Sequence, residues 1–206
     1  MHPNPAYRTA DRQRNLAFAR ERAFGLLAIS AGGAPLMAHV PFLLQDDVAD
    51  LHLLRSNPIA RALKTPQAAR IAVSGPDAYV SPDWYDIADQ VPTWNYVAVH
   101  LTGLLELRPQ KELRALLDRQ SALMEERLLP KPIWSTAKME AGTLERMMRQ
   151  IVPCRLRITD VDGTWKLSQN KPDPARLNAA DHMDAYGIGA ETGMLAALMR
   201  GAGGQG

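Results

Sequence analysis

The fold of this chain is decided by residues 24–44, which read FGLLAISAGGAPLMAHVPFLL. The stretch contains no acidic residue, lysine or arginine, and its length is close to that of a membrane-spanning helix, roughly 20 residues. The segment Ala31-Gly32-Gly33-Ala34-Pro35 interrupts it with residues that form turns and do not continue a helix. The stretch therefore predicts a hairpin of two apolar strands, residues 24–30 and 36–44, buried on both faces.

Further strands are predicted outward from this hairpin. Residues 69–74 and 78–81 flank Gly75-Pro76-Asp77 and predict a second hairpin. Residues 154–159 and 164–167 predict a third, which turns at Asp162-Gly163. The longest predicted strand covers residues 93–107, with Gly103 as a bend or bulge.

Helices are predicted from the three- and four-residue spacing of apolar side chains. They cover residues 11–22, 58–64, 110–129 and 140–150, and two more begin at Asp173 and at Met194. The helix at 140–150 is expected to carry Leu144, Met147 and Met148 inward.

Short strands joined by Gly/Pro turns, with helices placed outside them, predict a mainly β fold with peripheral α-helices. We expect a small closed barrel, because no β-α-β alternation is present. At 206 residues one domain is the default. The predicted domain covers residues 1–206, with a helical insertion at about 110–150, a helical C-terminal tail at about 173–200 and a flexible Gly-rich end.

Composition narrows the functional classes. Lysine plus arginine number 24 and aspartate plus glutamate 22, so no strong global field attracts nucleic acid or an anionic membrane. The single cysteine, Cys154, excludes an internal disulfide framework and is typical of a reducing compartment. Residues 1–5 lack the basic-then-apolar order of a secretory signal. These features predict a cytoplasmic protein.

Several catalytic and binding motifs are absent from the sequence. It has neither the lysine-bearing phosphate loop nor the Gly-rich dinucleotide fingerprint. The five histidines show no metal-ligand spacing, so no metal site is expected. No serine has the flanking glycines of a nucleophile elbow.

Residues 55–58, Arg55-Ser56-Asn57-Pro58, form the most informative polar segment. A helix that begins at Pro58 exposes unpaired backbone N–H groups, to which Arg55 and Ser56 add donors, and together they suit a phosphate group. The alternative is a plain helix cap by Asn57, and caps greatly outnumber anion sites.

Two later segments also carry candidate ligand-binding residues. Trp94 and Asn95 place a stacking surface beside an amide, which suits a planar ligand, although the aromatic ring could equally fill a core. Lys166, Ser168 and Gln169 gather donors at a strand end and suit an anionic ligand, or form an ordinary solvated strand end.

From its N-terminal helix to about Lys171, the chain resembles the PaiB-like FMN-binding negative transcriptional regulators. The resemblance is carried by six segments in the family's order: residues 38–42 (AHVPF), 52–58 (HLLRSNP), 75–85 (GPDAYVSPDWY), 91–100 (VPTWNYVAVH), Gly103 and 166–170 (KLSQN). The chain departs from the family pattern at Leu51, Leu54 and Ser56, where small residues are common.

The resemblance implies an FMN-binding split β-barrel, related to pyridoxamine-phosphate oxidases and flavin reductases, that forms a homodimer with flavin sites between subunits. By the same resemblance, Arg55, Ser56 and Asn57 would contact the flavin phosphate, while His39 and His52 would face the ribityl chain or ring. Further cofactor contacts would come from Trp94, Asn95, Lys166, Ser168 and Gln169.

The resemblance also implies a function, repression of transcription. No basic helix-turn-helix pattern supports direct DNA contact, and only Arg12, Arg14, Arg20 and Arg22 cluster near the N-terminus. A flavin-dependent oxidoreductase acting on a small heterocyclic substrate is the alternative, since flavin carries the chemistry and few catalytic side chains are needed. The third hypothesis is a barrel that has lost its flavin and acts as an interaction module. The sequence identifies no catalytic residue.

Overall fold

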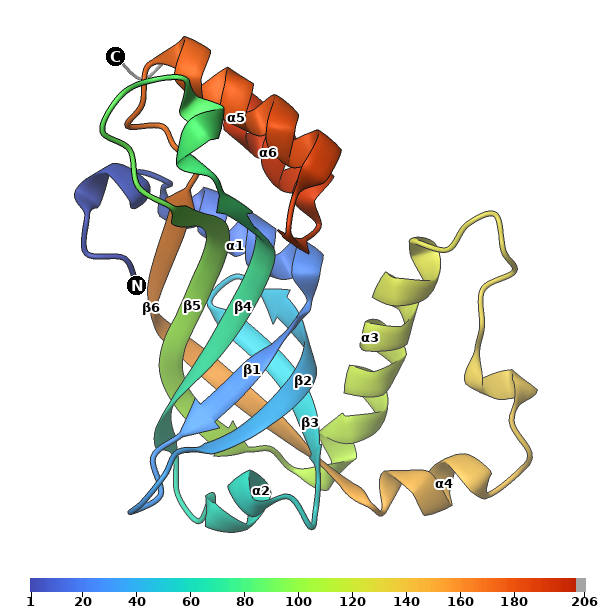
Figure 1. Cartoon of the computed structure of the whole chain (residues 1–206). Helices are drawn as coiled ribbons and strands as arrows, with labels where there is room; N and C mark the ends of the chain where they lie inside the picture. The colour runs from blue at the N-terminus through green and yellow to red at the C-terminus, as the bar shows by residue number, and fades with distance from the viewer. Residues whose placement is uncertain (203–206) are drawn as a thin grey trace. The chain divides into compact units, whose positions relative to one another are not determined.

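The computed structural model describes residues 1–202 and divides into two compact units (Figure 1). The barrel unit comprises residues 16–72 and 101–161, and the terminal unit comprises residues 1–15, 73–100 and the chain from Asp162 onward. That the whole chain forms a single domain stays a prediction. The predicted flexible end falls mostly on residues 203–206, which lie outside the described residues.

Six antiparallel strands close into a barrel in the order β1-β2-β3-β6-β5-β4, with β4 pairing back to β1. This confirms the predicted mainly β barrel with peripheral helices. Three of these strands, β4 to β6, contribute residues to both units. The strands are β1 (Phe24–Ile29), β2 (Leu36–Gln45), β3 (Val48–Leu54), β4 (Gln67–Val80), β5 (Thr93–Leu107) and β6 (Ile151–Lys166).

The first predicted hairpin is confirmed, since β1 and β2 pair from Phe24↔Pro41 to Ile29↔Leu36. Its burial on both faces was wrong. Side chains alternate between the barrel interior and its outer face, and Met37 is 62 % exposed while Val40 is 2 % exposed. A strand of a small closed barrel fills the interior with one face only, which is why alternate residues remain outside.

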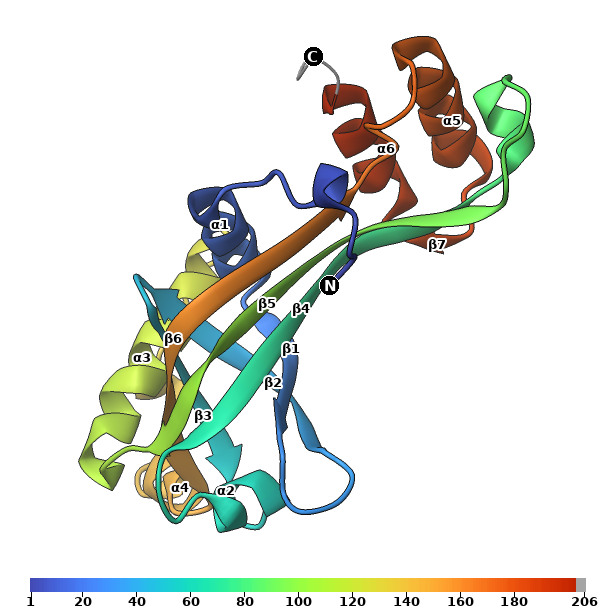
Figure 2. The ribbon, with the colours of Figure 1, turned by 90° about the vertical axis from the view of Figure 1, so that its left-hand side faces the viewer.

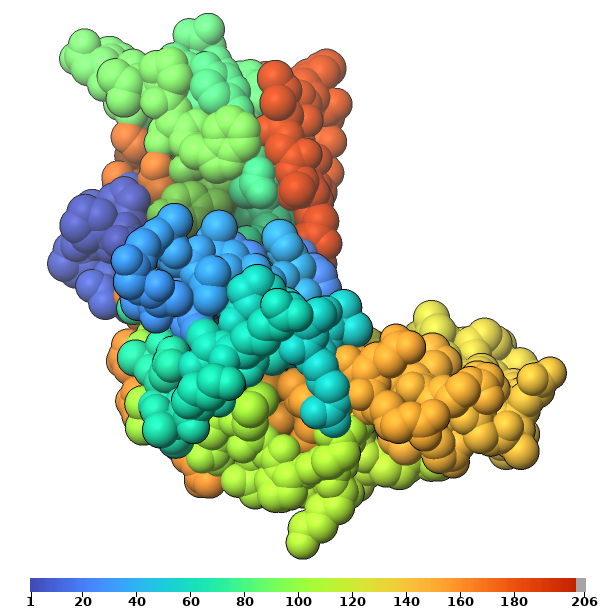
Figure 3. Space-filling view, turned by 90° about the horizontal axis from the view of Figure 1, so that it is seen from below, coloured from blue at the N-terminus to red at the C-terminus, as the bar shows by residue number. Residues whose placement is uncertain are grey.

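Helices lie within the predicted insertion at about 110–150: η3 (Gln110–Glu112), α3 (Leu113–Glu126), η4 (Thr136–Lys138) and α4 (Thr143–Met148). The α-helices α1 (Arg12–Arg22) and α2 (Pro58–Ala62) precede it in the chain. Helix α3 buries Leu113 and Leu116. Figure 3 shows α4 and the chain before it standing out beside the strands. Met147 is accordingly 56 % exposed, so its predicted inward orientation was wrong.

The terminal unit is built around a pair of helices, α5 and α6, which pack side by side (Figure 2). Met183, Leu195 and Met199 are fully buried in this unit. The two-residue strand β7 pairs with β4 through Asp77↔Ala190 and Ala78↔Gly189. The remaining elements and bounds are η1 (Pro5–Tyr7), η2 (Pro82–Tyr85), α5 (Asp173–Tyr186), β7 (Gly189–Ala190) and α6 (Thr192–Gly201).

Two predicted turns were wrong, because β4 and β6 each continue through them without a break. In β4, Pro76 falls after the residues that pair with β1 and before those that pair with β7, where a missing N–H costs no hydrogen bond to either strand. In β6, Gly163 serves close packing, since a Cβ there would lie 2.1 Å from Asn15 Oδ1.

Among residues 1–202, no helix combines the length and apolar character needed to cross a bilayer.

Candidate flavin-binding residues

The turn after β3 holds three of the predicted phosphate contacts. Asn57 caps α2, because its Oδ1 accepts the Ile59 N–H at 2.9 Å and Pro58 is the first helical residue. The predicted cap is confirmed. It occupies one of the N–H groups that a phosphate would use, and a helix of five residues has only a small dipole. The phosphate prediction therefore depends mainly on Arg55 and Ser56.

Arg55 is exposed and is held by neutral acceptors. Its Nε donates to the Arg149 carbonyl oxygen at 2.7 Å, and its Nη2 donates to Gln110 Oε1 at 2.6 Å. Among the described residues no carboxylate pairs with it, and its Nη1 has no partner. Ser56, the next residue, is also exposed. A pre-oriented guanidinium with unused N–H groups beside a hydroxyl is a donor set that fits the phosphate of FMN.

The two predicted histidines lie on the outer face of the barrel unit. His39 is exposed on β2, and its ring stacks on Phe24 with centroids 6.2 Å apart. His52 is half-buried on β3, and its Nδ1 lies 3.2 Å from Gln120 Oε1 on α3. Burial lowers the pKa of His52 below its usual value, and the hydrogen bond with Gln120 opposes that shift. His52 is therefore neutral at pH 7.

Trp94 and Asn95 belong to the terminal unit and differ in exposure. Trp94 is 43 % exposed, donates from Nε1 to Asp77 Oδ1 at 3.2 Å and meets Tyr79 edge to face. Asn95 is fully buried, and its Nδ2 donates to Ser168 Oγ at 2.8 Å. Its Oδ1 has no donor among the described residues, and such an atom is normally satisfied by bound water or a ligand group.

Ser168 and Gln169 use their polar groups to shape the chain after β6. Ser168 has a φ of +60°, and its Oγ also lies 2.8 Å from the Tyr85 hydroxyl. Gln169 accepts the Leu167 N–H and donates to the carbonyl oxygens of Ala6 and Trp165. Both side chains thus have structural roles, and their predicted contact with cofactor stays a prediction.

Lys166 differs from Ser168 and Gln169 because it is a charged residue. Among the described residues no carboxylate pairs with its ammonium group. Its Nζ donates to Thr93 Oγ1 and lies 5.8 Å from the centre of the Tyr7 ring. Burial lowers its pKa, and the nearby charge of Lys171 lowers it further. Lys171 in turn donates to Gln90 and faces Tyr85. An anion near this pair of lysines would relieve their repulsion.

The predicted residues fall into two groups. His39, His52, Arg55, Ser56 and Asn57 belong to the barrel unit. The second group, in the terminal unit, is Trp94, Asn95, Lys166, Ser168 and Gln169, of which Asn95 and Ser168 are in direct contact. The structure therefore brings Asn95 and Ser168 together, whereas His39, His52 and Arg55 each contact other residues of the barrel unit.

Sequence reasoning missed three residues that complete these groups. Tyr85 hydrogen-bonds Ser168, Lys171 adds the second charge beside Lys166, and Gln120 orients His52. Tyr85 and Lys171 lie within or directly after the segments used to detect the resemblance, so they could have been included. Gln120 sits on a helix 68 residues from His52, and no local pattern connects the two.

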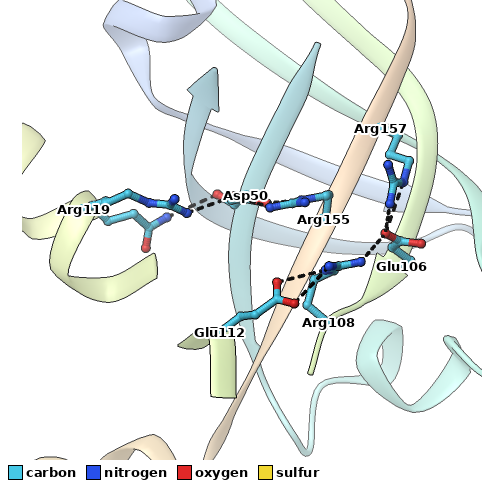
Figure 4. Close-up of polar contacts among 8 residues, drawn as sticks. Asp50, Glu106, Arg108, Glu112, Arg119, Arg155 and Arg157 are labelled. Carbon is cyan, nitrogen blue, oxygen red and sulfur yellow. Dashed lines mark hydrogen bonds and ion pairs between the residues drawn. The ribbon is translucent and has the colours of Figure 1, made fainter. Parts of the chain in front are cut away.

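An ion-pair network joins α3 to the outer face of β3, β5 and β6, and it was also missed (Figure 4). Asp50 accepts from Arg155 Nε at 2.6 Å and from Arg119 Nη2 at 3.2 Å. Glu106 pairs with Arg108 and Arg157 at 3.0 and 2.9 Å. Each of these carboxylates holds two arginines, and Arg119 is the member that belongs to α3, so the network stabilises the position of α3 against β3 through Asp50.

Within the described residues, no group of three histidine, cysteine or acidic side chains lies close enough to hold a metal ion. Cys154 is buried in the barrel, and burial raises the pKa of its thiol to about 12. Its thiol is therefore protonated and unreactive at neutral pH.

Comparison with solved structures identifies flavoproteins with the same fold. The FAD and heme binding protein from Mycobacterium smegmatis matches with a TM-score of 0.59 and 20% identity, over 89% of this chain and 82% of that one. The flavocytochrome Anf3 from Azotobacter vinelandii matches with a TM-score of 0.55 and 17% identity, over 80% and 72%. At these identities the matches establish the fold alone.

Comparison of sequences establishes the family. The protein named "Protease synthase and sporulation protein PAI 2" from Bacillus subtilis is 29% identical over 170 residues, which cover 81% of each chain. A family model described as "Putative FMN-binding domain" matches residues 1–160, more than half of the chain. The chain therefore belongs to the PaiB-like FMN-binding family, and FMN is its cofactor.

Proposed function

We propose that this protein is a cytoplasmic, homodimeric FMN-binding regulator that represses transcription. The single observation that carries the proposal is the family match over residues 1–160. The similarity to the Bacillus subtilis protein supports the regulatory part, because that protein is named for protease synthase and sporulation. In this proposal FMN is the sensed ligand, and its occupancy changes how the dimer binds its partner.

Arg55 and Ser56 are the proposed phosphate contacts. Arg55 is oriented by Gln110 and by the Arg149 carbonyl oxygen, so its guanidinium is already held in place before a ligand arrives. A held donor loses less conformational entropy on binding than a free side chain does. Ser56 can donate its hydroxyl hydrogen to the same phosphate, while Asn57 acts as the cap that shapes the turn.

In the terminal unit, Lys166 is the proposed contact for an anionic or electron-rich group. It is half-buried, has Lys171 as a neighbour and has no carboxylate partner among the described residues. The unpartnered Asn95 Oδ1 in the same unit is the atom that a bound water or ligand donor would satisfy.

Purified protein tests the proposal in two steps. Saturating FMN should raise the melting temperature, because a ligand present at a hundredfold excess over its Kd stabilises the folded state by about 2.7 kcal/mol. Light scattering after size-exclusion chromatography should give the mass of two chains. In a mobility-shift assay, DNA upstream of the protein's own gene should bind more tightly than shuffled DNA, with an affinity that depends on FMN.

Two results would contradict the proposal. A monomer that retains FMN would contradict the proposed homodimer. Equal binding of both DNAs, with and without FMN, would contradict the proposed role as a regulator. Reduction of the bound flavin by a nicotinamide cofactor and reoxidation by a heterocyclic substrate, without any effect on DNA binding, would instead support the oxidoreductase.

A further inference from the structure

A pocket lies in the barrel unit between α3, the chain after it and the outer face of β2 and β3. Its volume is about 300 Å³, at the lower end of the range of about 300–1,000 Å³ for small-molecule sites. The walls are mostly apolar: Pro41, Phe42, Leu117, Leu123, Met124 and Trp134. The polar lining consists of His52, Gln120, Ser121 and Glu125.

Among the polar groups of the pocket, His52 offers a ring nitrogen that can only accept a hydrogen bond, whereas the Ser121 hydroxyl can either donate or accept one. Gln120 Nε2 donates to the Asp50 carbonyl oxygen at 3.4 Å, so the Gln120 Oε1 must be the atom that faces His52. An amide oxygen only accepts, and His52 Nδ1 therefore carries the ring hydrogen. The other ring nitrogen, Nε2, is then an acceptor, and it has no hydrogen-bond partner among the described residues.

The pocket presents no unpaired charge. Glu125 is the only carboxylate among the lining residues, and it pairs with Lys131 and accepts the Trp134 N–H at 2.8 Å. Charged side chains that pack near His52 are likewise paired, since Arg119 binds Asp50 on the same strand as His52. A neutral ligand is therefore favoured over an ion.

We infer that this pocket binds a small, neutral aromatic molecule that donates one N–H or O–H hydrogen bond to His52 Nε2. The apolar walls bury a flat ring, and Trp134 provides an aromatic surface for it. His52 Nε2 supplies selectivity, because an acceptor that a ligand covers without offering a donor is costly. In this inference His52 serves a second ligand, a substrate or an effector, in place of the flavin contact that the resemblance implied for it, while Arg55 and Ser56 remain the proposed FMN contacts.

Matched probe molecules test this site, with indole as the N–H donor and 1-methylindole as the same ring without a donor. Binding to the FMN-loaded protein is measured by isothermal titration calorimetry. Indole should bind about tenfold more tightly than 1-methylindole, since one hydrogen bond is worth about that factor. His52→Phe should abolish this preference while 1-methylindole affinity stays within about twofold, and Gln120→Leu should reduce the preference.

Controls separate the pocket from other sites. His2→Phe changes a histidine of the terminal unit and should leave the preference intact. Leu117→Trp fills the pocket and should abolish binding of both probes, and circular dichroism checks that each variant is folded. The inference is overturned if the wild type does not discriminate between the probes, if His52→Phe keeps the preference, or if no probe binds.

FMN provides the last outcome. Indole affinity should be the same with and without saturating FMN. Competition between indole and FMN would mean that FMN occupies the pocket, and this would contradict a separate site. A protein that binds no FMN but still prefers indole would refute the proposed function and leave this inference intact.

Discussion

At the residue scale, burial decides which polar side chains are available to a ligand. Arg55 and Ser56 are exposed, whereas Asn95 and Ser168 are enclosed and bonded to each other. The sequence predicted the residue types in both segments, and the helix cap at Asn57 followed from local rules. Burial could not be predicted, because it depends on residues far away in the chain, such as Met199 beside Asn95.

His52 gives a prediction at this scale. Its pKa should lie below the usual value of about 6.5, because burial disfavours the imidazolium, and NMR titration of its ring carbon measures the pKa directly. Gln120→Leu should lower the pKa further by removing the hydrogen bond that opposes the shift. A pKa that rises in this variant would contradict the described environment.

The same shift sets the sign of a pH effect on stability. In the interval between the lowered folded pKa and the unfolded value, the unfolded chain binds more protons than the folded one. The contribution of His52 to the free energy of unfolding therefore increases as pH rises through that interval and is constant above it. His52→Phe should remove this part of the pH dependence in denaturant titrations.

At the element scale, close approach of strands explains Gly103. A Cβ at this position would lie 1.9 Å from the Arg157 carbonyl oxygen of β6. Gly103→Ala should therefore lower the free energy of unfolding by about 1–3 kcal/mol, the usual cost of overpacking. Gly33→Ala is the control, because nothing lies within 4 Å of a Cβ there, and it should be neutral. Equal urea midpoints for the two variants would contradict the packing.

Strand continuity was the part of the fold that local patterns missed. The turn residues at Gly75-Pro76 and at Asp162-Gly163 lie inside long strands, β4 and β6. Turn rules describe conformations that residues can adopt, whereas pairing with neighbouring strands decides which one they do adopt. The hairpin at Gly32-Gly33 was predicted correctly because its two strands pair directly with each other.

At the scale of the whole molecule, the barrel and the family assignment come from features distributed over the chain. Strand spacing predicted the closed sheet, and the family segments predicted FMN. The candidate residues lie in two units, and the phosphate prediction can be tested in one of them alone. Arg55 is the residue on which it depends, because it is the charged donor of the turn after β3.

The most direct test compares FMN with riboflavin, which lacks the phosphate, by calorimetric titration of the wild type and Arg55→Ala. We expect Arg55→Ala to weaken the binding free energy of FMN by about 1.5–3 kcal/mol, the contribution of a charge-assisted hydrogen bond. Riboflavin affinity should be unchanged. Arg114→Ala, at an exposed pair with Asp118, is the control and should bind both flavins like the wild type. Equal losses of FMN and riboflavin in Arg55→Ala would contradict the account.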